Sequence, residues 1–295
     1  MMAVLAPVVL SFLLASPARG ELLSAEALAG RAGMDSRFFR WLPAPDSPAY
    51  RAVPPENQGI HLTPEQALAV GRRIWQNESG GTISGLTHWN SGEDFASMGI
   101  GHFIWYREGH GGPFIESFPK LLGFLEAEGT ALPAWLRGQP PCPWQSKGDF
   151  FRDFQSPRMI ELRRLLEATV ALQARFAADR LEAALPKMLD TLPDSQRDHV
   201  RSQFYRVAGF STGVYALVDY VNFKGEGISP TERYHGQGWG LLQVLQGMEA
   251  VMPPLDEFAR SADEVLTRRV ANSPPARRES RWLEGWRKRL RTYVD

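Results

Sequence analysis

The chain has 295 residues, and 43% of them are hydrophobic, which is ample for the core of one large domain or two modest ones. Its 33 basic residues balance its 33 acidic residues, so charge gives no reason to expect a nucleic acid or an anionic membrane surface as partner. Cys142 is the only cysteine, which excludes an intramolecular disulfide, and its Pro-rich surroundings offer no basic group to activate a thiol.

The first 20 residues have the pattern of a secretory signal peptide. An apolar run from Ala3 to Ala15 precedes small residues that suit a cleavage site, although no Lys or Arg comes before the run. The run is shorter than the roughly 20 residues that a membrane-spanning helix needs, so we expect export without a stable membrane span. We therefore predict a periplasmic or secreted protein with a signal peptide at 1–20, a Pro-rich segment at 21–58 and one folded domain at 59–295.

Helical periodicity begins after Leu62. Thr63 and Gln66 form a capping box around a proline at the first helical position. Apolar residues then recur at helical spacing, which predicts a helix from Pro64 to about Asn77 that ends at Glu78. Its expected inner face consists of Ala67, Val70, Gly71, Ile74 and Trp75.

The rest of the chain is predicted to be mainly α (α+β), with one small β excursion. Residues 82–105 contain short β-type runs broken by Gly and Asn, which indicate a hairpin. Beyond them we predict helices over 114–128, 157–192, 196–207, 214–223, 239–251, 256–270 and 279–294. Residues 158–180 alternate apolar and charged side chains and indicate a long surface helix. The basic run at 287–291 is typical of a solvated helix C-terminus, and a surface that holds an anionic polymer is the alternative interpretation.

Glu78 is the main candidate for an acid catalyst. Cleavage of a glycosidic bond needs a group that protonates the leaving oxygen, and burial against apolar groups keeps such an acid protonated near neutral pH. Ile74 and Trp75 lie one helical turn before Glu78 and can desolvate it. Glu93 and Asp94 lie on a segment that can fold back toward Glu78, where a hydrated carboxylate would activate water. A solvated carboxylate at a helix end is the alternative interpretation of Glu78.

The order of these elements resembles the phage-type lysozymes, or endolysins. A Glu at a helix end, an acidic and polar hairpin, and a glycine turn that ends at His102 carry the resemblance. Glu78 matches the general acid of that family, His102 matches its structural His, and Ser97 lies near its Thr. The second carboxylate of the family has no position here that aligns without gaps, which leaves Glu93 and Asp94 as candidates, with Glu93 preferred.

A second motif lies at residues 220–243, where three alternating glycines precede a helix. Glycines let a backbone approach a ligand closely, and a helix N-terminus offers free N–H groups. The predicted substrate-binding residues are Trp89 and His102 from the first motif, with Asn222, Gln237 and Trp239 from the second. An equally weighted interpretation is a helix–helix corner whose glycines serve close packing.

The resemblance implies a lysozyme-like fold with a small β-hairpin lobe, a larger helical lobe and a glycan cleft between them. It implies hydrolysis of peptidoglycan between N-acetylmuramic acid and N-acetylglucosamine with inversion. Glu78 would give the proton, Glu93 or Asp94 would orient water, and Ser97 would position that water. No cofactor or metal is expected, because HExxH, G-x-S-x-G and phosphate-loop patterns are missing from the sequence.

Two other functions remain open. The stretch at 240–243 is similar to one in lytic transglycosylases, which use a single Glu and the substrate's own hydroxyl in place of water. The unmatched second carboxylate is also compatible with a wall-binding protein that keeps the fold and lacks activity. The sequence sets no oligomeric state.

Overall fold

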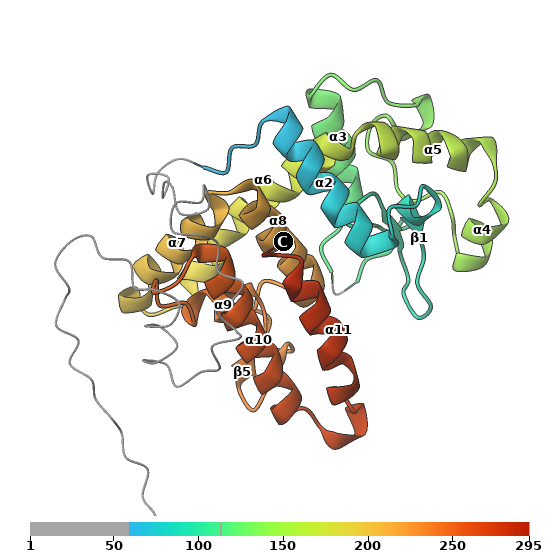
Figure 1. Cartoon of the computed structure of the whole chain (residues 1–295). Coiled ribbons are helices and arrows are strands. Elements are labelled where there is room, and N and C mark those ends of the chain that lie inside the picture. The colour runs from blue at the N-terminus through green and yellow to red at the C-terminus, as the bar shows by residue number, and fades with distance from the viewer. Residues whose placement is uncertain (1–58, 113, 295) are drawn as a thin grey trace, which may run out of the picture. The chain divides into compact units, whose positions relative to one another are not determined.

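The computed structural model of the chain describes residues 59–112 and 114–294 (Figure 1). The predicted signal peptide and the Pro-rich segment at 21–58 lie outside these residues. The described part is mainly helical with a small antiparallel sheet, which confirms the predicted mainly α class. Its α-helices are α2 (Pro64–Ser79), α3 (Phe118–Ala127), α4 (Lys147–Arg152), α5 (Pro157–Ala168), α6 (Val170–Asp190), α7 (Asp194–Ala208), α8 (Ser211–Lys224), α9 (Leu241–Gln246), α10 (Pro254–Asn272) and α11 (Ser280–Arg291).

Helix α2 forms as the sequence predicts. The Thr63 hydroxyl accepts the Gln66 N–H at 3.2 Å, and the Gln66 side chain accepts the Thr63 N–H at 2.9 Å. Gly80 ends the helix in the left-handed conformation, with φ at 62°. Four residues of the predicted inner face are buried, namely Ala67, Val70, Gly71 and Ile74. The fifth, Trp75, is partly buried. A Cβ at Gly71 would lie 2.7 Å from the Val170 carbonyl oxygen, so this glycine allows α2 and α6 to pack closely.

The sheet has three short strands in the order β1 (Thr87–His88), β2 (Ala96–Met98) and β3 (Phe103–Trp105), all antiparallel. Its register pairs His88 with Ser97 and Ser97 with Ile104. The loop of residues 89–95 leads into β2, and the glycine turn of residues 99–102 leaves it. These two connections therefore lie at opposite ends of the same strand.

The predicted helix over 157–192 is two helices, α5 and α6, so the prediction of one long surface helix over 158–180 is wrong in its length. The chain leaves helical geometry at Thr169, and α6 then begins at Val170. Small residues such as Ala174 and Ala178 bury one face of α6 against its neighbours. Most charged residues of this stretch lie on the exposed face, but Arg163 of α5 is buried and donates to the Thr87 hydroxyl at 2.8 Å.

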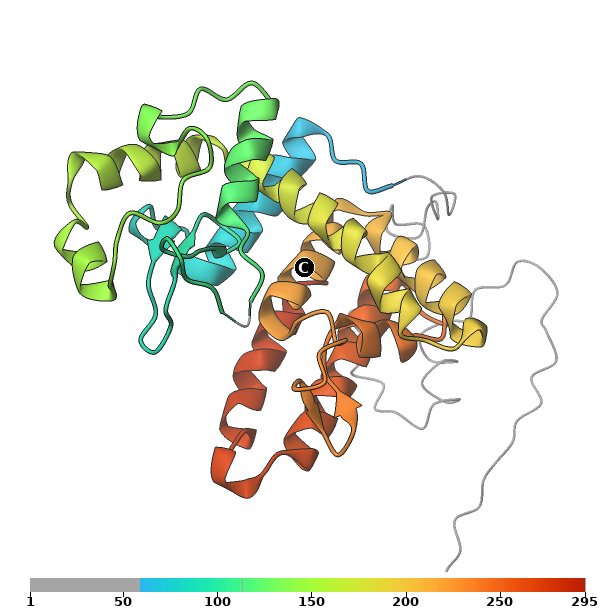
Figure 2. The ribbon, with the colours of Figure 1, turned by 180° about the vertical axis from the view of Figure 1, so that it is seen from behind.

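Helices α2 and α6 connect two groups of elements within residues 59–294. The sheet and α3 to α5 lie on one side, and α7 to α11 lie on the other (Figures 1 and 2). Helix α8 is buried along most of its length, and one continuous hydrophobic cluster runs through both groups.

A second hairpin, which the sequence did not predict, precedes α9. It consists of β4 (Arg233–Tyr234) and β5 (Gln237–Gly238). His235 and Gly236, with φ at 51° and 76°, form its two-residue turn.

Candidate active site

Glu78 lies in the last turn of α2, where side chains from two other elements reach it. His102 Nδ1 lies 3.2 Å from Glu78 Oε2, and the Arg289 guanidinium bonds to Glu78 Oε1. The Glu78 side chain is 14% exposed. The end of α2, the turn between β2 and β3, and α11 thus converge on one carboxylate.

The glycine turn presents His102 to Glu78. Gly99 has φ at 70° and His102 has φ at 47°, so both use the left-handed region that few non-glycine residues adopt. The buried Gln173 of α6 accepts the Ile100 N–H at 3.0 Å and stabilises the turn. The turn is therefore structural, as its glycines suggest, and its last residue also belongs to the site.

Arg289 is fixed from behind by Asp219, a fully buried carboxylate on α8. Asp219 accepts from Arg289 Nε at 2.7 Å and from Nη2 at 2.8 Å, which is the two-point contact that a guanidinium favours. The Tyr293 hydroxyl donates to Asp219 at 2.6 Å, and the Asn77 amide donates to it at 3.2 Å. Since Asn77 precedes Glu78, this network also ties the end of α2 to α8.

Arg289 and His102 decide the ionisation of Glu78. Burial raises the pKa of Glu78, but the hydrogen bond from His102 and the charge of Arg289 outweigh it, so the net pKa is lowered. The desolvation expected from the apolar turn of α2 is therefore present but is not decisive. At neutral pH and without substrate, Glu78 is a carboxylate.

Lys224 lies close to this network at the end of α8. Its amine lies 3.8 Å from the centre of the Phe223 ring and 3.5 Å from that of Trp286. Burial, with help from the positive charge of Arg269, lowers the pKa of Lys224 to about 6. The Arg289 guanidinium lies over the same Phe223 ring at 4.6 Å and is the permanent cation at Glu78.

The candidate second carboxylates lie at the other end of β2. Asp94 pairs with Arg107 at 3.1 Å, and its side chain is 62% exposed. The Glu93 carboxylate accepts from the Asn90 amide at 3.0 Å. No contact joins either carboxylate to Glu78 within the described residues, because the strand separates the two ends of the sheet.

Ser97 and Trp89, the other predicted site residues of the first motif, are buried. Ser97 is 4% exposed in the middle of the sheet. Trp89 is 2% exposed, and its indole N–H donates to the Glu93 carbonyl at 2.8 Å. The Trp89 ring is therefore covered by the core in this structure and offers no open face to a ligand.

The polar and glycine residues of the second motif bond to and pack against one another. Gln243 accepts the Gly240 N–H at 3.0 Å and donates to the Gly227 carbonyl at 3.0 Å. A Cβ at Gly240 would lie 2.2 Å from the Gly227 nitrogen, so the glycines serve close packing of two backbone segments. This geometry supports the packing interpretation of the motif.

The predicted binding residues of the second motif separate accordingly. Trp239 is 7% exposed and packs on Arg269 and Tyr234, so it is a core residue in this structure. Asn222 and Gln237 are exposed, and Gln237 accepts from an Asn272 amide at 3.0 Å. None of the three contacts Glu78 in the described structure.

The sequence pattern missed Arg289 and Asp219. The Arg289 side chain is 19% exposed, so the expectation of a solvated helix end at 287–291 is wrong for this residue. Asp219 had a visible signal, since it is the one carboxylate in the apolar run of residues 211–223. A lone charge in a buried helix requires a partner, although its identity is not visible locally.

Several other features bear on the chemistry. Burial raises the pKa of the Cys142 thiol to about 12, so it is a protonated core residue. Across residues 59–112 and 114–294, no three His, Cys, Asp or Glu side chains group closely enough to hold a metal ion. No helix in this part of the chain has the length and apolar character to cross a membrane.

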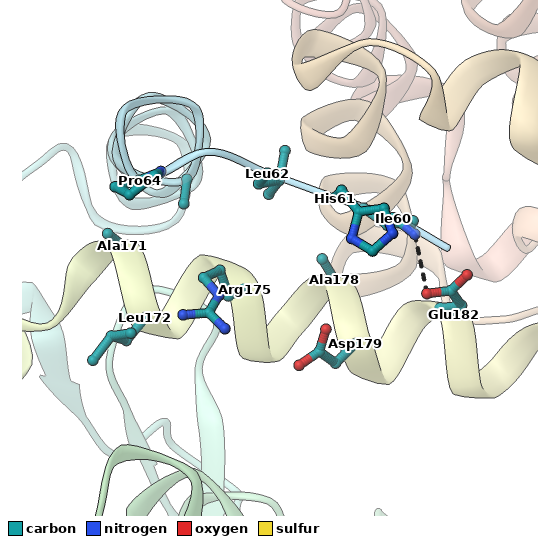
Figure 3. Close-up of a pocket in the computed structure, with 11 residues that line it drawn as sticks. Ile60, His61, Leu62, Pro64, Ala171, Leu172, Arg175, Ala178, Asp179 and Glu182 are labelled. Carbon is teal, nitrogen blue, oxygen red and sulfur yellow. Dashed lines mark hydrogen bonds between the residues drawn. The ribbon is translucent and has the colours of Figure 1, made fainter. Parts of the chain in front are cut away.

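The open groove in Figure 3, of about 460 Å³, lies between the start of α2 and α6. Its lining includes Leu62, Arg175, Asp179 and Glu182 but none of the predicted site residues. The groove is therefore separate from Glu78 and its contacts.

No protein-family model, no curated protein and no solved structure matches this chain.

Proposed function

We propose that this chain cleaves the glycosidic bonds of a peptidoglycan-like glycan strand, with Glu78 as the group that protonates the leaving oxygen. The observation that carries the proposal is the setting of Glu78. It is a largely buried carboxylate that His102 contacts from a glycine turn and Arg289 contacts from α11. The resemblance to phage-type lysozymes supplies the substrate class, and such a substrate implies action outside the cytoplasm.

The reaction begins when glycan binding displaces water from Glu78. Desolvation is the largest single influence that raises the pKa of Glu78, and a bound sugar strengthens it until the carboxyl group takes up a proton. After that proton passes to the leaving oxygen, the carboxylate regains its ion pair with Arg289. The regained ion pair favours the proton transfer. Asp219 contributes by holding Arg289 in place throughout.

A lytic transglycosylase is the second candidate, and the contacts of Glu93 and Asp94 favour it. Both carboxylates are bonded elsewhere, which leaves Glu78 without a second carboxylate to orient water. In that reaction a hydroxyl of the substrate attacks the sugar carbon. Glu78 first gives its proton to the leaving oxygen and then accepts the proton of the attacking hydroxyl.

Mass spectrometry of a digest tests the proposal. Purified peptidoglycan sacculi are incubated with the wild type, with Glu78→Gln and with Glu93→Gln. We expect Glu78→Gln to lose about 10³-fold in rate, because an amide cannot give the proton. Reducing ends in the wild-type products indicate hydrolysis, and anhydro ends indicate transglycosylation.

Glu93→Gln is the matched control, since it removes a carboxylate that does not contact Glu78. We expect it to keep most of the wild-type rate, and a large loss would restore Glu93 as the second catalytic carboxylate. Equal rates for the wild type and Glu78→Gln would overturn the assignment of Glu78. If all three proteins, the wild type included, bind the sacculi and none cleaves them, the result would favour the inactive wall-binding alternative.

A further inference from the structure

Helix α11 carries a surface beside Glu78 that the proposed chemistry does not use. Trp282, Gly285 and Arg289 are three, four and seven residues apart, so they share one face of the helix. Arg289 reaches Glu78 from this face. Arg287 projects from another face and pairs with a carboxylate of α10 at 2.7 Å. The face that contains Trp282 is therefore the one that continues from Glu78.

Gly285 interrupts this face without a structural reason. A Cβ added there meets no atom within 4 Å, and the residue lies in regular helix. Neither packing nor backbone conformation requires glycine, although glycine weakens a helix interior relative to alanine. Its effect is to leave the helix backbone bare between Trp282 and Arg289, a length of about 10 Å.

An aromatic platform borders the bare segment. Trp282 is 40% exposed, and its ring centre lies 6.2 Å from that of Trp286. Trp286 is fixed in turn by its contacts with Phe223 and Lys224. Indole faces of this kind bind the apolar faces of ligand rings at little entropic cost.

Basic residues are concentrated at this surface, although Arg277, Arg287, Arg289 and Arg291 each pair with a carboxylate. Residues 277–291 contain seven basic residues (Arg277, Arg278, Arg281, Arg287, Lys288, Arg289 and Arg291) against two acidic ones (Glu279 and Glu284). Arg281 lies over the Trp282 ring at 4.8 Å. Within the described residues, neither Arg281 nor Lys288 has a carboxylate at ion-pair distance. Such a surface favours a ligand that brings its own negative charge.

We propose that Trp282, Gly285 and Arg289, with Arg281 and Lys288 at the edge, form a shelf that binds a sugar ring of a glycan strand together with a carboxylate carried on the peptides attached to that strand. A sugar ring lies across the bare backbone at Gly285 and stacks on Trp282, and a carboxylate of an attached peptide reaches Arg281 or Lys288. The shelf positions an acidic glycan strand beside Glu78. This inference rests on the proposed function for the identity of the ligand.

Binding to purified sacculi tests the shelf, with Glu78→Gln as the parent so that cleavage does not interfere. Gly285→Ala, Gly285→Leu and Trp282→Ala are added to this parent. Gly285→Ala strengthens the helix, so weaker binding by that variant does not come from unfolding. Gly148→Ala, at an exposed glycine of α4, is the matched control.

We expect Gly285→Leu and Trp282→Ala to weaken binding by about tenfold and Gly285→Ala to weaken it less. Gly148→Ala should bind as the parent does. Sacculi whose carboxylates have been converted to amides should bind the parent about tenfold more weakly. Equal binding of the parent and Gly285→Leu to untreated sacculi would overturn the proposal. So would a dependence on Gly285 that appears only with vesicles of anionic phospholipid, since it would identify a membrane surface as the partner.

The outcomes for the shelf and for the proposed function are separate. If the wild type leaves sacculi intact while binding depends on Gly285, the shelf stands and the catalytic proposal fails. If the wild type cleaves sacculi while binding is independent of Gly285, the reverse holds.

Discussion

The two glycine-rich segments of this chain, at residues 99–102 and 225–240, are stabilised alike. The side-chain oxygen of Gln173 accepts the Ile100 N–H of the first segment at 3.0 Å. The side-chain oxygen of Gln243 accepts the Gly240 N–H of the second segment, also at 3.0 Å. Each also contains a glycine at positive φ where a Cβ would collide with that oxygen. The distance would be 2.2 Å at Gly99 and 2.3 Å at Gly227.

The segments differ in the side chain that each one presents. The first ends at His102, which contacts the ionised Glu78 and so joins the network of Arg289. The second leads to Trp239, which is buried against Arg269. A glycine motif therefore indicates close backbone packing, and a ligand site requires in addition a polar side chain that leaves the motif and meets other polar groups.

The largest effect is expected for a substitution of Asp219. This carboxylate holds Arg289, which contacts Glu78 beside His102 of the first segment. Asp219→Ala leaves Arg289 without its main partner and should lower the free energy of unfolding by about 3–5 kcal/mol in urea titrations. Cleavage should fall as well, since Arg289 is no longer held at Glu78. The change in rate is measured at a temperature at which the variant is folded.

Glu257→Ala is the matched control for Asp219→Ala. Glu257 is also fully buried and pairs with Arg206 at 3.0 Å, but it does not contact the Glu78 network. It should lower stability by a similar amount while the folded protein keeps its cleavage rate. If both variants reduce cleavage equally, Asp219 has no role beyond stability.

The sequence predicted the local parts of this site and missed the partner that completes it. The capping box, the buried face of α2 and its end near Glu78 follow from spacing and turn chemistry, which act over a few residues. Arg289 bonds to Glu78 across 211 positions of sequence, and its neighbours follow the ordinary pattern of a basic helix end. The local pattern therefore indicated solvent where the fold supplies an ion pair.

The fold class was predictable because helical periodicity is a local pattern. The burial of single residues was not predictable, because it depends on distant segments. Helical periodicity fixed the positions of most helices, yet it did not show which face of α6 is central. Trp89 and Trp239 illustrate the limit, since tryptophan serves equally as a binding platform and as a core residue. Only the packing of distant segments decides between these two uses.

A smaller effect distinguishes the two glutamines. Gln173→Ala leaves the buried Ile100 N–H without an acceptor and should lower the free energy of unfolding by about 2 kcal/mol. Gln243 is partly exposed, so Gln243→Ala should cost only about 1 kcal/mol, as water replaces part of its bonding. Sacculus cleavage by the folded variants then compares the segments directly.

We expect Gln173→Ala to reduce cleavage, because the loosened turn no longer presents His102 to Glu78. Gln243→Ala should retain the wild-type rate. A loss of cleavage in Gln243→Ala that equals the loss in Gln173→Ala would contradict the difference between the segments and return the second one to the active site.

The smallest effect is a pH dependence that only the first segment should show. Because the folded-state pKa of Glu78 is lowered, ionised Glu78 stabilises the fold above its unfolded pKa of about 4.3, and this stability is lost as pH falls through the lower folded value. Glu78→Gln removes the ionisable group and keeps the shape. The wild type should therefore exceed Glu78→Gln in stability by about 1–2 kcal/mol near neutral pH, and the difference should shrink as the pH falls below the unfolded pKa and through the lower folded-state pKa. Gln243→Ala removes no charge, so its deficit should stay constant over the same range. If the stability difference between the wild type and Glu78→Gln also stays constant with pH, Arg289 and His102 do not favour the ionised form of Glu78. The first segment would then have no electrostatic role that the second one lacks.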